Sequence, residues 1–247
     1  MGSEIWLAPL RRSSWLGLFW PAYNRGSLWL LNIPEAAYSL GPPGARTCHQ
    51  PEYAWSWEGD RLRASIPKES ADPQAAIDLV FQPDKYGVAI DLRVTNVQSA
   101  PYITAASFGV CLRNSAAWRF GDPAGERTLV RCCGRWASLC DLLGSDAITK
   151  ARNMPLGRSD SVSDEGIIAR LNEDGTAGVA IAWAHVHELC SNLAPNISCI
   201  HSDPALGALP PGESTRVRGR LWFGRWDLDE LYDLYREDVA PTFPGRG

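Results

Sequence analysis

The chain has 247 residues, which suits one large β-sandwich or barrel with a substantial core. Hydrophobic residues make up 45% of it and charged residues 21%, a balance typical of a globular protein. The net charge is −4, basic residues occur only in short runs such as Arg11-Arg12, and no apolar run reaches the roughly 18 to 20 residues of a membrane span. We therefore expect no nucleic-acid partner and no membrane partner.

Residues 1–45 are rich in Trp and Pro and predict an N-terminal extension packed on the main domain. The strand pattern becomes regular at Tyr53, Trp55 and Trp57, which alternate with small or polar residues up to a Gly59-Asp60 turn. An aliphatic row at 62, 64 and 66 follows, so the segment predicts a hairpin. Facing residues of a hairpin share one face, which favours core packing of the aromatic ladder over a sugar-binding platform.

Apolar residues at alternate positions predict most of the remaining structure as strands. These strands are expected at residues 77–81, 88–94, 102–112, 128–132, 135–139, 167–171, 178–187 and 215–223. Both faces of the segment 178–187 are apolar, which predicts a central strand covered on each side. Residues 141–166 are dominated by Asp, Ser, Gly and Arg and predict a long loop.

The chain is expected to end in an amphipathic helix over residues 227–239. Asp227 is suited to cap its first turn and Glu230 stands at the capping-box position, while an apolar stripe follows at helical spacing. Pro241 stops the helix. Together these patterns predict one domain over residues 1–247, mainly β, an antiparallel β-sandwich of supersandwich or jelly-roll type with a short C-terminal α-helix docked on it.

The strongest candidate site lies at the end of the segment 178–187 and in the loop expected after it. His185 and His187 would share one strand face, and His201 and Asp203 follow two residues apart. A histidine oriented by a carboxylate is a general acid or base arrangement, so we expect these four residues to be catalytic. The alternatives are packed histidines without a catalytic role, or a divalent metal held by His185, His187 and His201, although no cofactor is favoured.

Two arginines and three tryptophans are candidates for substrate binding. Arg127 and Arg131 would share one strand face and hold an anionic group such as a carboxylate, with surface arginines as the plainer interpretation. Trp118, Trp136 and Trp222 lie near turns or strand ends, where aromatic rings can meet a sugar. Trp136 would also lie opposite Arg131 in a hairpin, and a cation–π pair explains it equally well.

Seven cysteines without a C-x-x-C pair favour free, partly buried thiols. A disulfide between the neighbours Cys132 and Cys133 would be strained. Free thiols favour the cytoplasm, and an exported protein with one or two disulfides and a removed leader is the alternative. The oligomeric state and the compartment stay open.

The turn at residues 209–214, followed by the strand at 218–223, resembles the closing strands of galactose-mutarotase-like supersandwich domains, which occur in sugar epimerases and glycan-degrading enzymes. The catalytic His and Glu motifs of mutarotases have no match. The segments 127–131 and 199–201 are similar in order to the Arg-rich and Gln-Ile-His motifs of jelly-roll alginate lyases. There Cys199 replaces the Gln, and the C-terminal Tyr motif has no match.

Both resemblances imply a β-sandwich that acts on a carbohydrate ligand. Our hypothesis is therefore a protein that cleaves or modifies an oligo- or polysaccharide by acid and base chemistry at His201. A non-catalytic module that binds a sugar or a protein is the alternative, and a metal-dependent enzyme is the second alternative. Whether the chain is an enzyme, such as a glycoside hydrolase, a polysaccharide lyase or an epimerase-like enzyme, stays open at this point.

Overall fold

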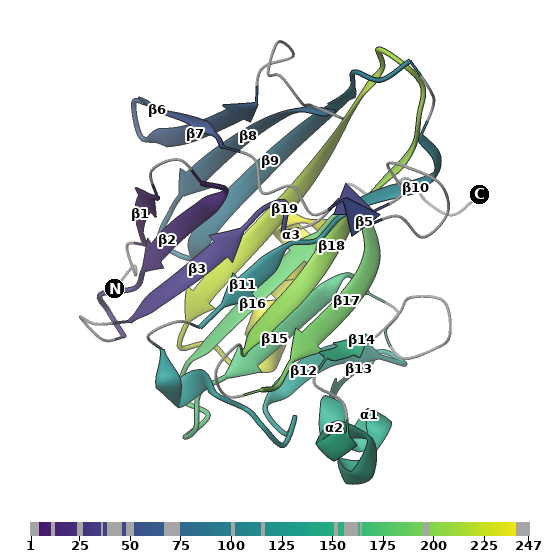
Figure 1. Cartoon of the computed structure of the whole chain (residues 1–247). Helices are drawn as coiled ribbons and strands as arrows, with labels where there is room; N and C mark the ends of the chain where they lie inside the picture. The colour runs from purple at the N-terminus through teal and green to yellow at the C-terminus, as the bar shows by residue number, and fades with distance from the viewer. Residues whose placement is uncertain are drawn as a thin grey trace.

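A computed structural model of the chain describes residues 5–10, 13–23, 27–35, 37–38, 46–47, 52–66, 75–99, 102–114, 117–150, 153–155, 163, 165–194 and 198–240. In this part of the chain, two antiparallel sheets pack face to face as a β-sandwich (Figure 1). The mainly β prediction is thereby confirmed.

The first sheet is ordered β1-β2-β3-β11-β18-β10-β4-β5, and β17 pairs with β18 while β14 pairs with β17. Its strands are β1 (Trp6–Pro9), β2 (Trp15–Phe19), β3 (Leu28–Asn32), β4 (Ala37–Tyr38), β5 (Arg46–Thr47), β10 (Tyr102–Phe108), β11 (Cys111–Arg113), β14 (Asn153–Pro155), β17 (Val186–Asn192) and β18 (Cys199–Leu209). The N-terminal residues thus form the first three strands at one end of this sheet, with β1 at its edge.

The second sheet is ordered β13-β12-β15-β16-β19-β9-β8-β7-β6. Its strands are β6 (Ala54–Glu58), β7 (Arg61–Ile66), β8 (Ala75–Pro83), β9 (Gly87–Asn96), β12 (Thr128–Cys132), β13 (Arg135–Ser138), β15 (Ile167–Leu171), β16 (Gly178–Trp183) and β19 (Ser214–Gly224). The predicted hairpin of β6 and β7 is confirmed: Trp55 faces Ala64, Trp57 faces Leu62, and Gly59 adopts a φ of 66° in the turn.

The aromatic ladder of that hairpin runs from the core to the solvent. Tyr53 is buried and donates its hydroxyl to the carbonyl of Ile33, 2.7 Å away. Trp55 is half-buried and stacks on Phe81, whereas Trp57 is 53% exposed. The predicted core packing therefore holds for the first part of the ladder only.

The main core lies between the sheets because alternate residues of each strand point inward. Leu31, Leu112 and Ile200 from the first sheet meet Ile181 and Leu221 from the second, and all five are almost completely buried. Burial of each such side chain stabilises the fold by about 1.5 to 3 kcal/mol. This packing decides which face of β18 points inward, and Ile200 lies on that face.

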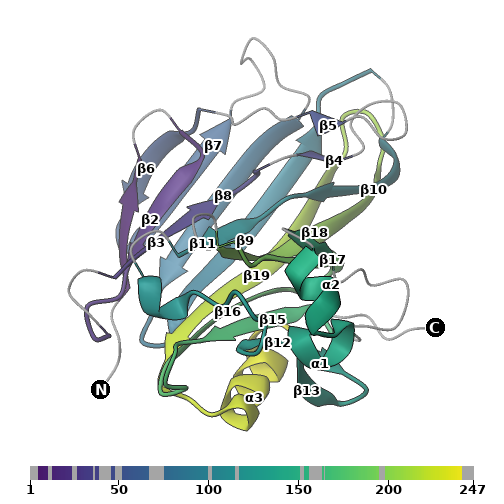
Figure 2. The same cartoon turned by 60° about the horizontal axis from the view of Figure 1, so that its bottom comes forward.

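A second, smaller core lies on the outer face of the second sheet, under α3 (Leu228–Asp238) (Figure 2). Ala180, Ala182 and Trp222 from the sheet pack there against Leu231 and Tyr235 of the helix. Asp227 caps the helix by accepting a hydrogen bond from the backbone N–H of Glu230. The predicted C-terminal helix is confirmed, and so is the central strand covered on both sides, which is β16.

Four local predictions were wrong. The expected strand 102–112 is two strands, β10 and β11, with Gly109 and Val110 between them. The segment 178–187 is not one strand, because the chain bends at Ala184 and His185 and passes from β16 in one sheet to β17 in the other. Residues 199–204 are not a loop but the start of the long strand β18. Pro204 is tolerated there because the register between β17 and β18 shifts beside it.

The segment 141–166 is not a continuous loop either. It contains the end of α1 (Leu139–Leu143), all of α2 (Ser145–Lys150) and β14. Ser138 caps α1 by accepting from the backbone N–H of Asp141. A 3-10 turn, η1 (Trp118–Phe120), precedes β12. Polar residues that suit a loop therefore also supply caps and first turns of short helices.

All six cysteines in the described residues are free, as the sequence predicts for them, while Cys48 lies outside the described residues. The Cys132 and Cys133 sulfurs are 3.7 Å apart and share a hydrogen bond rather than a disulfide. None of the described helices has the length and apolar character needed to cross a bilayer.

Candidate functional site

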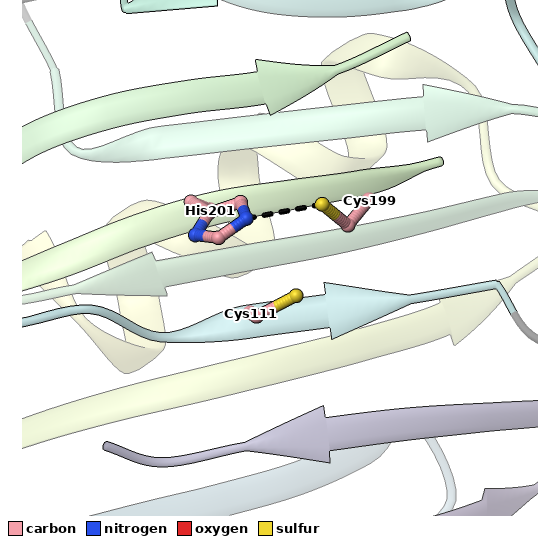
Figure 3. A group of neighbouring side chains, drawn as sticks. All are labelled: Cys111, Cys199 and His201. Atoms are coloured by element: carbon pink, nitrogen blue, oxygen red, sulfur yellow. Dashed lines mark hydrogen bonds between the residues drawn. The ribbon is translucent and has the colours of Figure 1, made fainter. Parts of the chain in front are cut away.

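A group of polar and sulfur-containing side chains lies on the outer face of the first sheet, where β11 and β18 run side by side. Cys199, His201 and Asp203 occupy alternate positions of β18, so they share the face opposite to Ile200 in the core. Cys111 of β11 lies directly across from His201 in the antiparallel register. We call these four residues and Glu35 the β18 cluster (Figure 3 draws Cys111, Cys199 and His201).

The imidazole of His201 is held between a sulfur and two carboxylates. Its Nε2 lies 3.0 Å from Sγ of Cys199. Its Nδ1 lies 3.7 Å from Oε2 of Glu35 and 3.9 Å from Oδ1 of Asp203. Each ring nitrogen therefore faces a different kind of partner, and the ring orientation is fixed from both sides.

The two carboxylates are anchored by the backbone around β11. Glu35 donates its backbone N–H to the carbonyl of Gly109, 2.7 Å away, which keeps the turn after β3 beside the cluster. Asp203 is buried, and its Oδ1 accepts the backbone N–H of Val110 at 2.8 Å. The side chain of Glu35 remains 39% exposed, so this carboxylate can also meet a ligand.

Burial and close contact shift the protonation equilibria of the β18 cluster. Burial raises the pKa of Asp203 to about 7. Burial alone would lower the pKa of His201, but the contact with Cys199 outweighs it and raises the pKa. A hydrogen bond from Cys111 lowers the pKa of Cys199 and outweighs its burial, and the contact with His201 adds to this effect. Cys199 and His201 thus form a pair that favours thiolate and imidazolium.

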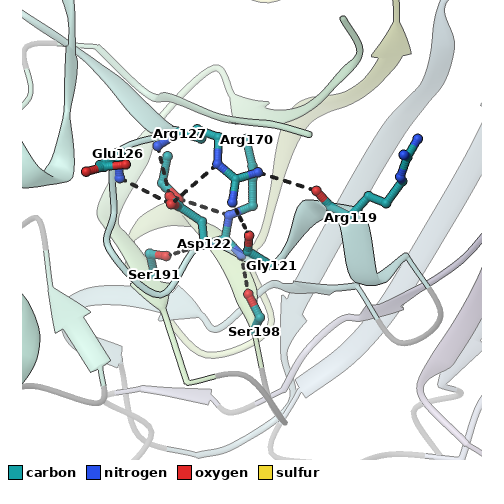
Figure 4. A network of polar contacts seen from close by, with 9 residues as sticks. Arg119, Gly121, Asp122, Glu126, Arg127, Arg170, Ser191 and Ser198 are labelled. Carbon is teal, nitrogen blue, oxygen red and sulfur yellow. Dashed lines mark hydrogen bonds and ion pairs between the residues drawn. The ribbon is translucent and has the colours of Figure 1, made fainter. Parts of the chain in front are cut away.

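A buried arginine lies on the core side of the same strands (Figure 4). Arg170 of β15 crosses between the sheets and donates to Ser198 Oγ at 2.5 Å, to Ser191 Oγ at 2.7 Å and to the carbonyl of Cys199 at 3.4 Å. Its Nε donates to Thr128 Oγ1 at 2.9 Å, and burial lowers its pKa to about 10. Arg170 therefore ties the backbone of the β18 cluster to the second sheet.

The structure brings together only part of the predicted site. His201 and Asp203 lie in one cluster, whereas His185 lies in the bend before β17 and His187 is exposed on β17. The two are not alternate residues of one strand in the same sheet, because the chain changes sheets between Trp183 and Val186. Among the described residues, the group able to share a metal ion consists of Cys111, Cys199 and His201, so only His201 of the three predicted ligands belongs to it.

The predicted arginines contact the protein itself. Arg127 donates to the carbonyls of Gly121 and Arg119 and lies 3.9 Å from Asp122 (Figure 4). Its part in binding an anionic ligand stays a prediction.

Arg131 packs over the ring of Tyr232 at 3.9 Å and lies 3.7 Å from Glu165. It also lies over the Trp136 ring at 5.7 Å, which confirms the cation–π interpretation of that pair. These contacts fix α3 on the sheet and leave only 8% of the Arg131 side chain exposed.

The three tryptophans are placed differently from one another. Trp222 is completely buried under Tyr235 of α3, so the expectation that it meets a substrate was wrong. Trp136 is half-buried and donates its Nε1 to the carbonyl of Leu228. The backbone of Trp118 lies in η1, and its side chain lies outside what the structure describes.

Two clefts lie on the second sheet, away from the β18 cluster. The larger, of about 450 Å³, is lined by residues of β8, β9 and β19. The ion pair of Asp91 with Arg216 crosses it, and Arg63 pairs with Asp78 beside it. Cross-strand pairs of this kind are ordinary features of an exposed sheet face.

Sequence reasoning missed Cys111, Glu35 and Arg170. Cys111 and Glu35 carry no local signal, because each enters the cluster through pairing with a distant strand or turn. Arg170 did carry one: it is a charged residue inside the apolar strand β15, and such a residue requires buried partners.

Comparison with known proteins places the chain by its fold alone. No protein-family model and no curated protein sequence matches it. Solved structures do match. A galactose mutarotase-like protein from Lactobacillus casei shares 12% identity at a TM-score of 0.52, with 91% of this chain and 98% of that chain covered. A second such protein, from Clostridium acetobutylicum, shares 9% identity at a TM-score of 0.50, with 91% and 99% covered.

A polysaccharide lyase shares 11% identity at a TM-score of 0.51, with 96% of this chain but 35% of that chain covered. The chain therefore shares its β-sandwich fold with these structures, in line with the resemblance at residues 209–223.

Proposed function

We propose that the chain binds a sugar on the outer face of the first sheet and catalyses proton transfer at the anomeric hydroxyl and the ring oxygen, interconverting the two anomers. One observation carries this proposal. The carboxylate of Glu35 and Nδ1 of His201 lie 3.7 Å apart on the outer face of a galactose mutarotase-like fold. At that distance the two groups are not hydrogen-bonded to each other, and both can act on one ligand.

The chemistry needs one base and one acid. Opening the ring of a cyclic sugar removes the proton of the anomeric hydroxyl and gives a proton to the ring oxygen; closing it on the other face of the carbonyl reverses both transfers. Glu35 is the exposed carboxylate and takes the first proton. The Nδ1–H of His201 gives the second. No covalent intermediate is required.

Asp203 supports this pair without touching the sugar. It is buried, is fixed by the backbone N–H of Val110, and lies 3.9 Å from the ring nitrogen that acts as acid. It therefore orients the His201 ring and favours a proton on Nδ1. The proposal keeps the acid and base role expected for His201 and adds Glu35 as its partner.

Polarimetry of freshly dissolved aldoses, among them α-galactose and α-glucose, tests the proposal directly. The chain is expected to accelerate the approach to anomeric equilibrium. Glu35→Gln and His201→Asn are expected to lower kcat by roughly 10²- to 10⁴-fold, the usual contribution of a general acid or base. His187→Asn is the matched control, because His187 is exposed on the neighbouring strand, and it should keep the full rate.

Two results would contradict the proposal. One is no acceleration with any aldose while calorimetry detects binding of a sugar, which would identify a binding module. The other is a full rate in both Glu35→Gln and His201→Asn.

A further inference from the structure

Three soft donor atoms converge on the other side of the His201 ring, away from Glu35. The Sγ atoms of Cys111 and Cys199 and a ring nitrogen of His201 all lie within 4.8 Å of one another. All three residues are buried. Cys199 and His201 come from β18 and Cys111 from the neighbouring β11, so two rigid, paired strands hold the three positions (Figure 3).

We propose that Cys111, Cys199 and His201 form a zinc-binding site. Two thiolates and one imidazole are a known ligand set of zinc, and the softness of sulfur disfavours magnesium and calcium there. Two thiolates also balance the charge of one divalent ion, so the loaded site is neutral in its buried position. This inference goes beyond the proposed function and does not depend on it.

The separations suit a tetrahedral ion. Bonds of about 2.3 Å to sulfur and about 2.05 Å to nitrogen place the two donor atoms roughly 3.5 Å apart at a tetrahedral angle. Sγ of Cys199 and Nε2 of His201 are 3.0 Å apart. An opening of about 0.5 Å, which side-chain rotation provides, therefore admits the ion.

Two carboxylates lie behind the ring of His201, where metal-binding histidines usually have an acceptor. A metal on Nε2 leaves the ring proton on Nδ1, and that nitrogen faces the carboxylates of Asp203 and Glu35. A carboxylate behind the ligating histidine fixes the tautomer and strengthens the ligand. The same tautomer keeps an N–H pointing toward Glu35.

A buried polar side chain beside the donor atoms lacks a hydrogen-bond partner for its amide nitrogen. Asn32 of β3 lies directly across from Cys111, is completely buried, and its Nδ2 has no hydrogen-bond partner in the described part of the chain. An N–H at this place is suited to donate to the Cys111 thiolate or to an oxygen bound at the fourth position of the ion. With three protein ligands, that fourth position is open to water or another small ligand.

Cobalt(II) provides a spectroscopic test that involves no sugar and no activity. The full chain, freed of metal and kept reduced, is titrated with Co²⁺ and then with Zn²⁺. We expect one cobalt per chain, near-ultraviolet thiolate-to-cobalt charge-transfer bands, visible bands of tetrahedral intensity, and loss of all these bands on addition of zinc. Elemental analysis of the zinc-loaded chain should then give a stoichiometry near one.

Variants identify the ligands. Cys111→Ser and Cys199→Ser should each weaken the charge-transfer bands. Asp203→Asn should weaken zinc binding by roughly 10- to 100-fold, as loss of the carboxylate behind a ligating histidine does. Cys140→Ser is the matched control, since Cys140 is a half-buried thiol on α1, and its spectrum should equal that of the original chain.

Circular dichroism checks that each variant folds, and the titration of the unchanged chain decides the question if a variant does not. A zinc stoichiometry near zero, or cobalt binding without thiolate bands, would overturn the proposal. So would bands that survive in both Cys111→Ser and Cys199→Ser. A chain without mutarotation that still binds zinc in this way would contradict only the proposed function.

Discussion

Arg170 offers the sharpest test of how the two sheets are held together. Its guanidinium is completely buried between them and donates to Thr128, Ser191, Ser198 and the carbonyl of Cys199. Arg170→Met keeps a long unbranched side chain in the same space but removes every donor. The hydroxyl groups around it are then left in an apolar interior.

The expected loss follows from these contacts. A hydrogen bond to a charged group contributes about 1.5 to 3 kcal/mol, and four such bonds are removed. Two effects reduce the sum: the buried charge no longer has to be desolvated, and Thr128 and Ser191 keep acceptors for their own hydroxyl protons at Asp122 and Cys199. We therefore expect Arg170→Met to lower the free energy of unfolding by about 3 to 5 kcal/mol.

Urea unfolding followed by tryptophan fluorescence measures this change. With a slope near 3 kcal/mol per molar urea, the midpoint should fall by about 1 to 1.7 M. Arg135→Met, at an exposed arginine of β13, should stay within about 0.5 kcal/mol of the original chain. Adding Ser191→Ala and Ser198→Ala to Arg170→Met should recover part of the loss, because unpaired acceptors are removed with their donor. A loss below about 1 kcal/mol for Arg170→Met would refute the reasoning.

Three further expectations concern stability. Burial raises the pKa of Tyr53, so above the unfolded value near 10 the unfolded chain loses this proton first and stability falls as pH rises. Urea unfolding at about pH 8 and pH 11 should therefore show a smaller loss of stability in Tyr53→Phe than in the original chain. An equal loss in both would contradict this. Asp227→Ala removes the cap of α3 and should cost about 1 kcal/mol in the same assay, whereas no change would show that the cap is dispensable. Trp222→Ala should cost about 3 to 5 kcal/mol and the exposed Trp57→Ala under about 0.5, and similar losses would disprove the assigned burial.

Much of the secondary structure was predictable because turns, caps and alternating patterns depend on residues close together in the chain. The hairpin of β6 and β7 follows from a Gly-Asp turn between two alternating segments, and both its register and its turn agree with the prediction. The same holds for α3, whose cap and apolar stripe lie within three turns of each other. Interactions between residues that are near neighbours in the chain can be predicted from the sequence.

The candidate site was predictable only in part. His201 and Asp203 were found because a single residue separates them, although they were expected in a loop and lie in a strand. Glu35 and Cys111 reach the same place from 166 and 90 positions earlier in the chain, through the turn after β3 and the pairing of β11 with β18. His187 was expected beside His201; it lies on β17, which pairs with β18, but it is exposed whereas His201 is buried.

The sequence by itself determined which residues alternate, where turns and caps fall, and hence that the chain is a β-sandwich closed by a helix. Only the tertiary structure decided which strands are neighbours and which sheet each one joins. Strand pairing joins distant segments through backbone hydrogen bonds that nearly every residue can make, so side-chain patterns specify a face but not a partner. The β18 cluster depends on the partner, and for that reason it becomes visible only in the folded chain.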